Sequence, residues 1–157
     1  MPILLSDADI AGLLTERKPL PEYYQSRLQL RAKSGHKERE LDTKGLVGSD
    51  FQFIIRQSLL NPLDFSVILG YSMPGLNVLF RLRRYNGRSH QHTNRIEGNT
   101  FYDFHIHTAT EHYQSMGYDE DHYAEPTDRF ADLNGAIQCM LQDCAFEVPS
   151  GTQESLF

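Results

Sequence analysis

The sequence has no tryptophan, only two cysteines and no long apolar run. No apolar stretch approaches the roughly 18 residues that a membrane-spanning helix requires, and two thiols cannot supply the framework of a disulfide-stabilised domain. Cys139 and Cys144 stand five residues apart in a segment with helical periodicity, so they point in different directions and are expected to stay reduced. The N-terminus also lacks the positive region of a secretory signal. These absences predict a cytoplasmic protein without a membrane span.

The length of 157 residues is that of a single domain of average size. A chain of this length can bury about two thirds of the surface of its unfolded state, so a core can form without metal ions or disulfides. The sequence contains no internal repeat and no linker. We therefore expect one domain over residues 1–146, followed by a loose tail over residues 147–157.

The charges are distributed unevenly along the chain. Residues 1–96 carry 14 basic and 9 acidic side chains, whereas residues 97–157 carry 1 basic and 12 acidic side chains. Arg81, Arg83, Arg84, Arg88 and Arg95 fall within 15 residues that contain no acid. A local basic stripe attracts phosphate groups even on a protein with a net charge of −6. Alternatively, these arginines form ion pairs with the acidic second part of the chain.

Helical periodicity occurs near both ends of the chain. Ser6 and Asp9 have the spacing of a capping box and predict a helix over residues 7–17. Near the C-terminus, apolar residues repeat at intervals of three and four, which predicts a helix that begins after Thr127 and has one apolar face.

Between these helices, apolar and polar residues alternate as in half-buried strands. The alternation predicts strands at residues 24–33, 37–41, 51–59, 65–71, 76–82 and 102–106. The predicted fold is α+β, with a twisted antiparallel sheet of about five to seven strands and an N-terminal and a C-terminal helix packed on one face. The expected core consists of Phe53, Ile55, Phe65, Val67, Leu69, Val78, Phe80, Leu82, Phe104, Ile106, Phe130, Leu133, Ile137 and Leu141.

Five of the seven histidines lie between residues 90 and 112. His105 and His107 occupy alternate positions of a predicted strand, so both imidazoles are expected on its solvent-facing side. The loop over residues 86–100 brings a second His-x-His pair, His90 and His92, to the edge of that surface. The preceding strand is expected to add Arg81, Arg83 and Tyr85 to it.

Such a surface is suited to metal-independent cleavage of RNA. One imidazole can take the proton of the 2′-hydroxyl group, a second can protonate the leaving oxygen, and arginines can stabilise the charged phosphorane. Tyrosine and arginine can also stack on unpaired bases. The candidate catalytic residues are His105, His107, His90, His92 and Tyr85, and the candidate RNA contacts are Arg81, Arg83, Arg84 and Arg88.

Two other interpretations fit the same residues. The two His-x-His pairs, His90, His92, His105 and His107, could bind zinc, with Asp103 as a further ligand or as a partner of a ligand. The histidines could instead be ordinary polar residues on the interaction surface of a non-catalytic binding domain. His122, like His36, is expected at the surface in either case.

Four short motifs follow one another in the second part of the chain: RRYNG at residues 83–87, HQHTN at residues 90–94, FHIH at residues 104–107 and DRF at residues 128–130. Their order resembles that of a bacterial family of small proteins and is similar in layout to the TumE-like toxins of toxin–antitoxin pairs. The resemblance covers about residues 64–145, and residues 1–60 add a helix and strands to that layout. It implies a small antiparallel sheet with a functional face near residues 83–107, a toxin-like or defence-related role, and an antitoxin-like protein as partner.

Overall fold

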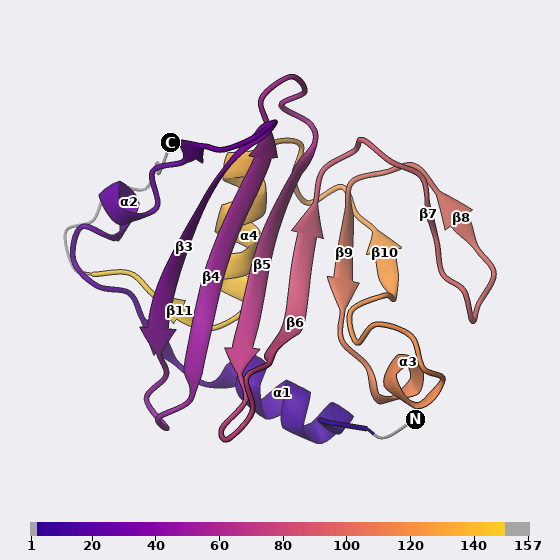
Figure 1. Ribbon diagram of the computed structural model, residues 1–157, viewed down its shortest axis with the longest axis horizontal. Helices are drawn as coiled ribbons and strands as arrows, with labels where there is room; N and C mark the ends of the chain where they lie inside the picture. The colour runs from indigo at the N-terminus through magenta and orange to yellow at the C-terminus, as the bar shows by residue number, and fades with distance from the viewer. Residues whose placement is uncertain (1–2, 150–157) are drawn as a thin grey trace.

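The computed structural model describes residues 3–149 and has an antiparallel sheet of seven strands at its centre, in the order β10-β9-β6-β5-β4-β3-β2 (Figure 1). These strands are β2 (Arg31–Ala32), β3 (His36–Lys44), β4 (Asp50–Ser58), β5 (Phe65–Ser72), β6 (Leu79–Asn86), β9 (His105–Thr108) and β10 (Ala124–Pro126). The α+β class and the antiparallel sheet predicted from the sequence are confirmed. The end of the expected tail, residues 150–157, lies outside the described residues.

Four helices and two short strand pairs surround the sheet in the described part of the chain. The helices are α1 (Asp7–Thr15), α2 (Tyr24–Arg27), α3 (Glu111–Ser115) and α4 (Leu133–Asp143). The strand pairs are the parallel pair of β1 (Lys18–Pro19) and β11 (Phe146–Glu147) and the hairpin of β7 (His92–Thr93) and β8 (Thr100–Phe101). None of the helices within residues 3–149 has both the length and the apolar composition needed to cross a membrane.

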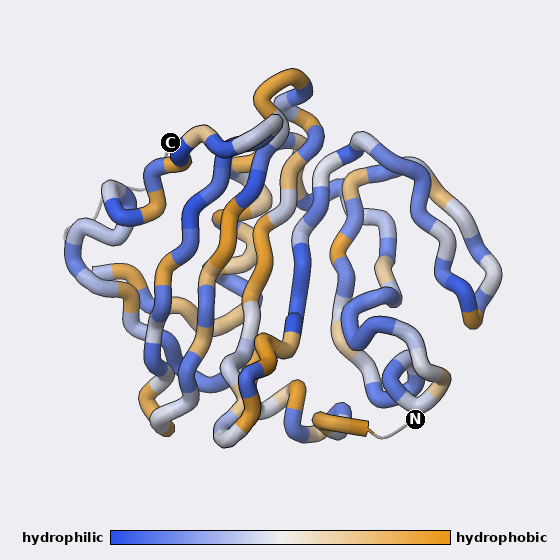
Figure 2. The backbone as a smooth tube through the Cα atoms, viewed as in Figure 1, coloured by the Kyte–Doolittle hydropathy of each residue, from blue (hydrophilic) through white to orange (hydrophobic). Residues whose placement is uncertain are grey.

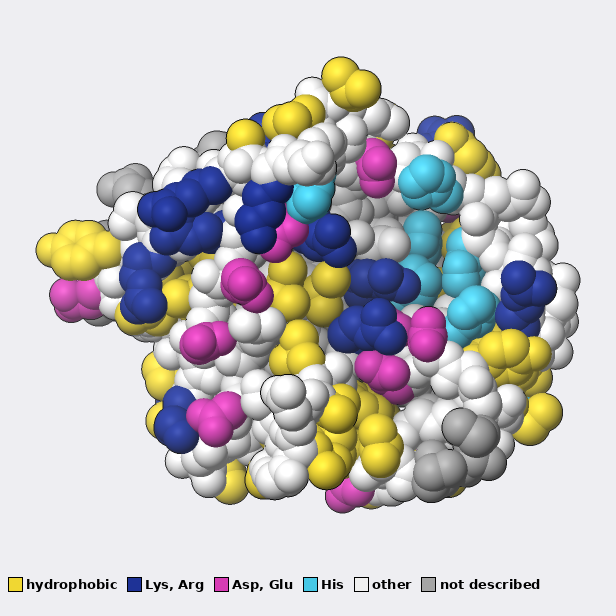
Figure 3. Space-filling model, viewed as in Figure 1, with side chains coloured by type: hydrophobic (Ala, Val, Ile, Leu, Met, Phe, Trp, Pro, Cys, Tyr) yellow, Lys and Arg dark blue, Asp and Glu magenta, His cyan; other side chains and the backbone are white. Residues whose placement is uncertain are grey.

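The two faces of the sheet have different surroundings. Helix α4 packs against one face, which we call the inner face, and it lies behind β4 and β5 in the view of Figure 1. Hydrophobic residues recur along β4, β5 and α4 in Figure 2, and the inner-face residues Phe53, Val67 and Leu69 are fully buried. The opposite face, which we call the outer face, is the one seen in Figure 3.

Most of the predicted core is buried, with three exceptions. Val78 is 45% exposed beside the β5–β6 turn, and Phe104 and Ile106 are only half-buried. Phe104 lies just before β9 and Ile106 lies on it, and both pack at the side of the core, where Phe104 contacts Phe65 and Phe130. The two cysteines are free and buried, as expected.

The boundaries of several predicted elements were wrong, among them the strand expected at residues 76–82, which is β6 over Leu79–Asn86. Residues 24–33 are not one strand, because the buried Tyr24 and Leu28 lie four apart on the short helix α2 and on its C-cap. Helix α4 begins at Leu133 rather than near Thr127, since the Asp132 side chain accepts the Gly135 N–H at 2.7 Å and caps it there. Of the strand expected at residues 102–106, only His105 and Ile106 are in a strand, at the start of β9, and residues 102–104 connect β8 to β9.

The capping box predicted for the first helix is present. The Asp9 N–H donates to the Ser6 hydroxyl at 3.0 Å, and the Ser6 N–H donates to the Asp9 carboxylate at 3.1 Å. The helix ends at Thr15, two residues before the predicted end, and the chain enters β1 at Lys18.

A glycine lets two loops meet at one end of the outer face. A side chain at Gly87 would overlap the Leu63 carbonyl oxygen, so only glycine allows the β4–β5 loop to come so close. The Ser89 hydroxyl donates to the Asp64 carboxylate at 3.1 Å and fastens the two segments together. This contact positions Asp64 beside the outer face.

Candidate functional site

A bulge in β6 separates the arginines that the sequence placed together. Leu69 pairs with Arg83, but the next residue, Gly70, pairs with Arg81, so Leu82 is the additional residue. Because side chains alternate between faces, this insertion turns Arg83 and Tyr85 toward α4 on the inner face. Arg81 and Arg84 remain on the outer face. The prediction that Arg81, Arg83 and Tyr85 share a surface was therefore wrong.

Tyr85 is an interior residue rather than a catalytic one. Its side chain is fully buried, and its hydroxyl donates to the Asp143 carboxylate of α4 at 2.7 Å. Burial raises the pKa of this phenol far above neutrality. Arg83 lies beside it with Nη1 3.9 Å from Asp143 Oδ2, and Arg129 binds the same carboxylate through two hydrogen bonds of 2.8 and 2.9 Å.

The outer-face arginines of β6 also have acidic partners. Arg81 binds Glu120 at 3.2 Å, and both Arg81 and Arg84 lie 3.5 Å from the buried Asp121 carboxylate. The interpretation that arginines of this stripe pair with the acidic second part of the chain is therefore correct for Arg81, Arg83 and Arg84. Their charges are compensated within the fold, which leaves them poorly suited to hold phosphate groups.

Four histidines converge on the outer face, but they are not the four expected. His92, His105, His107 and His122 have ring centroids between 4.8 and 5.6 Å apart in the contacts that join them. In Figure 3 they form the cyan group beside the arginines of β6. We call these four residues the histidine cluster. His122, expected to be a surface residue, belongs to it, whereas His90 does not.

Each ring of the cluster donates one N–H to a fixed oxygen. His105 and His107 donate from Nδ1 to the carbonyl oxygens of Asp103 (2.8 Å) and Asp121 (2.9 Å). His122 donates from Nε2 to the Thr93 carbonyl oxygen at 3.1 Å. A carbonyl oxygen can only accept, so each bonded nitrogen carries the hydrogen and the other nitrogen is free of it in the neutral ring.

His92 fastens the β7–β8 hairpin to the sheet. Its Nε2 donates to the Asn94 side-chain oxygen at 2.9 Å, and the same oxygen accepts the Ala124 N–H of β10 at 2.9 Å. The Asn94 amide in turn donates to the Ala124 carbonyl oxygen at 2.8 Å. Asn94 thus occupies the free edge of β10, and the hairpin covers the histidines of β9.

Three rings of the cluster, those of His92, His105 and His107, are held in their uncharged form. Burial lowers the pKa of His107 to about 2, and the neighbouring Arg84 guanidinium acts in the same direction. Burial also lowers the pKa of His105 and of His92. His105 and His107 are only 5% and 3% exposed, so the expectation that they face solvent was wrong: the hairpin of residues 92–101 lies over them.

The structure gives no support to the zinc interpretation. Within residues 3–149, no three His, Cys, Asp or Glu side chains are grouped so that they could hold a metal ion. His90 is separated from the other three proposed ligands, with its Nε2 4.0 Å from the Asp64 carboxylate and its side chain 79% exposed.

A second group of side chains crosses one end of the outer face, and the sequence had singled out only Arg88 and His90 of its members as candidates. We call it the basic band, and it consists of Arg31, Lys33, His36, Arg56, Arg88, His90 and Tyr102. Lys33, His36 and Arg56 surround Glu38 at 3.2, 2.7 and 3.5 Å, and Arg31 is paired with Glu38 across β2 and β3. Figure 3 shows basic side chains gathered on the upper left of this face and acidic ones below them.

The other half of the basic band lies on the segment that follows β6. Arg88 lies over the Tyr102 ring at 5.9 Å and donates from Nε to the Tyr102 carbonyl oxygen at 3.2 Å. The Tyr102 hydroxyl donates to the Ser89 carbonyl oxygen at 3.2 Å, beside His90. Arg88, His90 and Tyr102 are exposed. Of the four arginines proposed to contact RNA, Arg88 is thus the exposed one, and within the described residues it has no ion pair.

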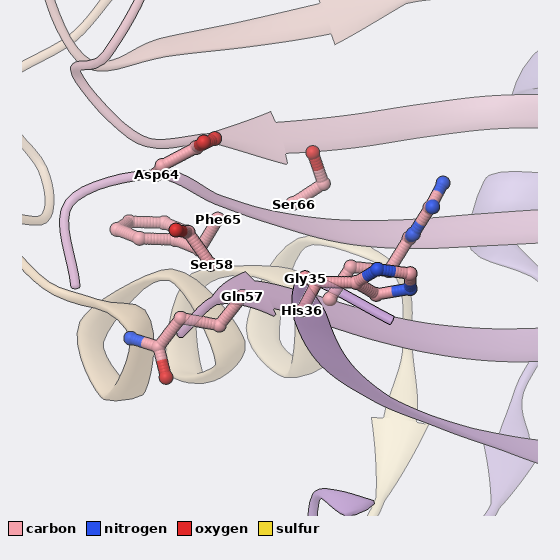
Figure 4. A pocket seen from close by; sticks show the side chains of 8 residues that line it. Gly35, His36, Gln57, Ser58, Asp64, Phe65 and Ser66 are labelled. Carbon is pink, nitrogen blue, oxygen red and sulfur yellow. The ribbon is translucent and has the colours of Figure 1, made fainter. Parts of the chain in front are cut away.

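A cavity of about 310 Å³ is lined by His36 and Arg56 of the first half of the band and reaches Asp64, whose carboxylate lies 4.0 Å from His90 of the second half. Its lining comes from the β2–β3 turn, from the ends of β4 and β5 and from the β4–β5 loop, and consists of Gly35, His36, Arg56, Gln57, Ser58, Asp64, Phe65 and Ser66 (Figure 4). Arg56, Ser66, Asn86 and His105 are paired in register across β4, β5, β6 and β9. This row links the cavity to the histidine cluster.

Comparison of the chain with protein-family models, with curated proteins and with solved structures gave no match in any of the three. Function must therefore be argued from the geometry of the outer face.

Proposed function

We propose that the protein binds single-stranded RNA along the basic band of its outer face, as a binding protein. The observation that carries the proposal is the accessibility of the band. Arg31, Arg56 and Arg88 are exposed, and Glu38 and Asp64 are the carboxylates that lie among the band's residues. An excess of accessible cations attracts phosphate groups locally even though the whole chain carries a net charge of −6.

The band also offers rings on which bases can stack. His36, His90 and Tyr102 are partly or fully exposed, and the Arg88 guanidinium lies against the Tyr102 ring. Proteins that bind single strands combine such aromatic platforms with a positively charged track. Cleavage by His105 and His107 is not part of the proposal, because the β7–β8 hairpin keeps a polymer away from both rings. A toxin-like role with an antitoxin-like partner stays a prediction from the resemblance to TumE-like toxins.

The test is the salt dependence of RNA binding, measured by fluorescence anisotropy with a labelled RNA of about ten nucleotides. For single strands, the slope of log K against log salt changes by about 0.7 for each phosphate contact. Arg31→Gln, Arg56→Gln and Arg88→Gln are each expected to reduce the slope by about that amount and to weaken binding about threefold to tenfold.

The matched control is Lys44→Gln, at the opposite end of β3. Lys44 is 66% exposed and paired with Asp50 at 3.0 Å, so it is as accessible as the arginines of the band but lies among acids. Its removal should leave both affinity and slope unchanged. Absence of binding at about 50 mM salt, or equal losses in the control and in the band variants, would refute the proposal.

A further inference from the structure

We infer that the cavity beside the basic band takes one base of the bound RNA and that Asp64 selects guanine there. This inference rests on the proposed function. The cavity has the size of a small ligand site, near the lower end of the range of about 300–1,000 Å³ for such pockets. Its lining combines His36 and Arg56 of the basic band with Asp64, which lies beside His90, so an RNA strand bound along the band would pass it.

The acidic wall of the cavity supplies only hydrogen-bond acceptors. Asp64 Oδ1 accepts from the Ser89 hydroxyl at 3.1 Å, and Oδ2 lies 4.0 Å from His90 Nε2. Neither of these two neighbours of the Asp64 carboxylate is an arginine or a lysine. An ionised carboxylate has about four acceptor positions in all, so both oxygens of Asp64 can still receive donors from a ligand.

Among the four RNA bases, guanine is the one that matches this carboxylate. Its Watson–Crick edge presents two adjacent donors, N1–H and the 2-amino group, which can meet the two oxygens of one carboxylate. Adenine and cytosine each present one amino donor beside a ring acceptor, and uracil presents one N–H between two carbonyl oxygens. In those three bases an acceptor would face the negative charge of Asp64 and oppose binding.

The other wall can hold the sugar–phosphate backbone and the face of the base. Both ring nitrogens of His36 are occupied, Nδ1 by the Ser34 carbonyl oxygen at 3.0 Å and Nε2 by Glu38 at 2.7 Å, which leaves the ring face for stacking. Arg56 is 53% exposed, and its Nε lies 3.5 Å from Glu38 Oε1, so the guanidinium group is accessible to a phosphate. Ser66 adds a hydroxyl group to the lining of the cavity (Figure 4).

The experiment compares oligouridylates of equal length that carry one central guanosine, inosine, adenosine or cytidine. We expect the guanosine RNA to bind about tenfold more tightly than the adenosine and cytidine RNAs, and the inosine RNA, which lacks the 2-amino group, to fall between them. Asp64→Asn replaces one acceptor by a donor, so the ratio between the affinities for the guanosine RNA and the adenosine RNA should fall from about tenfold to near one.

Asp42→Asn, on the acidic half of the outer face, is the matched control and should keep the full preference. Thermal unfolding of each variant checks that the fold is intact. If RNA binds with equal affinity whichever base it carries, or if the guanine preference survives Asp64→Asn, the inference is wrong and the proposed function still stands. If no RNA binds, the proposed function itself fails.

Discussion

Replacing Lys18 with methionine is expected to lower the free energy of unfolding by about 3 kcal/mol, because a buried ammonium group binds several carbonyl oxygens there. Lys18 is 0% exposed. Its Nζ donates to the carbonyl oxygens of Leu13 (2.8 Å), Leu14 (3.2 Å), Glu16 (2.8 Å) and Cys144 (2.7 Å). The ammonium thus joins the C-terminal ends of α1 and α4, where the helix dipoles favour a cation.

Methionine has the same length and apolar stem as lysine but leaves these carbonyl oxygens without their donor. Burial lowers the pKa of Lys18 to about 8, so the group is still mostly protonated at pH 7. The ammonium also lies 4.6 Å from the centre of the Phe51 ring, which adds a cation–π contact. Chemical denaturation at pH 7 measures the loss. Lys44→Met, at an exposed ion pair, should change the stability by less than about 0.5 kcal/mol; equal effects of the two substitutions would contradict the role of Lys18.

Acidification from pH 6.5 to pH 4.5 is expected to remove at least about 2 kcal/mol of stability through His107 alone. The folded state keeps this ring neutral, with a pKa of about 2, whereas the unfolded chain takes up a proton near pH 6.5. When the pKa of a group is lower in the folded state than in the unfolded chain, the free energy of unfolding decreases as the pH falls below the pKa of the unfolded chain. The loss amounts to about 1.4 kcal/mol for each pH unit until the folded pKa is reached.

The groups around His107 explain why a proton is not accommodated. Arg84 on β6 and the rings of His105 on β9 and His92 on β7 all oppose a positive charge on His107. The Asp121 carbonyl oxygen, which accepts from Nδ1, is the favourable contact, while the Asp121 carboxylate is bound to Arg81 and Arg84. The largest cause of the lowered pKa of His107 is its burial, which disfavours the charged form of the ring.

His107→Asn keeps a donor near the position of Nδ1 but cannot be protonated. The variant should be less stable than the wild type at pH 7, because asparagine does not fill the space of the buried ring. Because asparagine takes up no proton, the free energy of unfolding of the variant should decrease by about 2 kcal/mol less than that of the wild type between pH 6.5 and pH 4.5. Denaturation curves over this pH range measure the difference. The control is His90→Asn, at a side chain that is 79% exposed, and it should leave the pH dependence unchanged. A wild-type stability that does not decrease as the pH falls below 6.5 would contradict the neutral state of His107 in the folded protein.

The local patterns of the sequence predicted much of the sheet. The strands predicted from alternation at residues 51–59 and 65–71 are confirmed, because β4 and β5 are regular strands with one face on the core. The bulge in β6 interrupts the same rule. Apolar residues at positions 80, 82 and 85 break the alternation, and this break was the available signal that Arg83 would turn to the inner face.

The candidate site depended on long-range packing that no local pattern contains. His105 and His107 do alternate on β9, as expected, but their burial results from a hairpin that folds back over them. His122 stands alone in an acidic segment and had no signal in the sequence. The basic band combines β2, β4 and the segment after β6, whose proximity follows from strand order rather than from spacing.

The most direct test of RNA binding on the outer face is an NMR titration of the full-length chain with a single-stranded RNA of about ten nucleotides that contains one guanosine. The account expects the largest chemical-shift changes at Arg31, Arg56, Arg88, His90 and Tyr102, with little change along α4 on the inner face. Shift changes concentrated on α4 or on the acidic half of the outer face, or no changes at low salt, would contradict it.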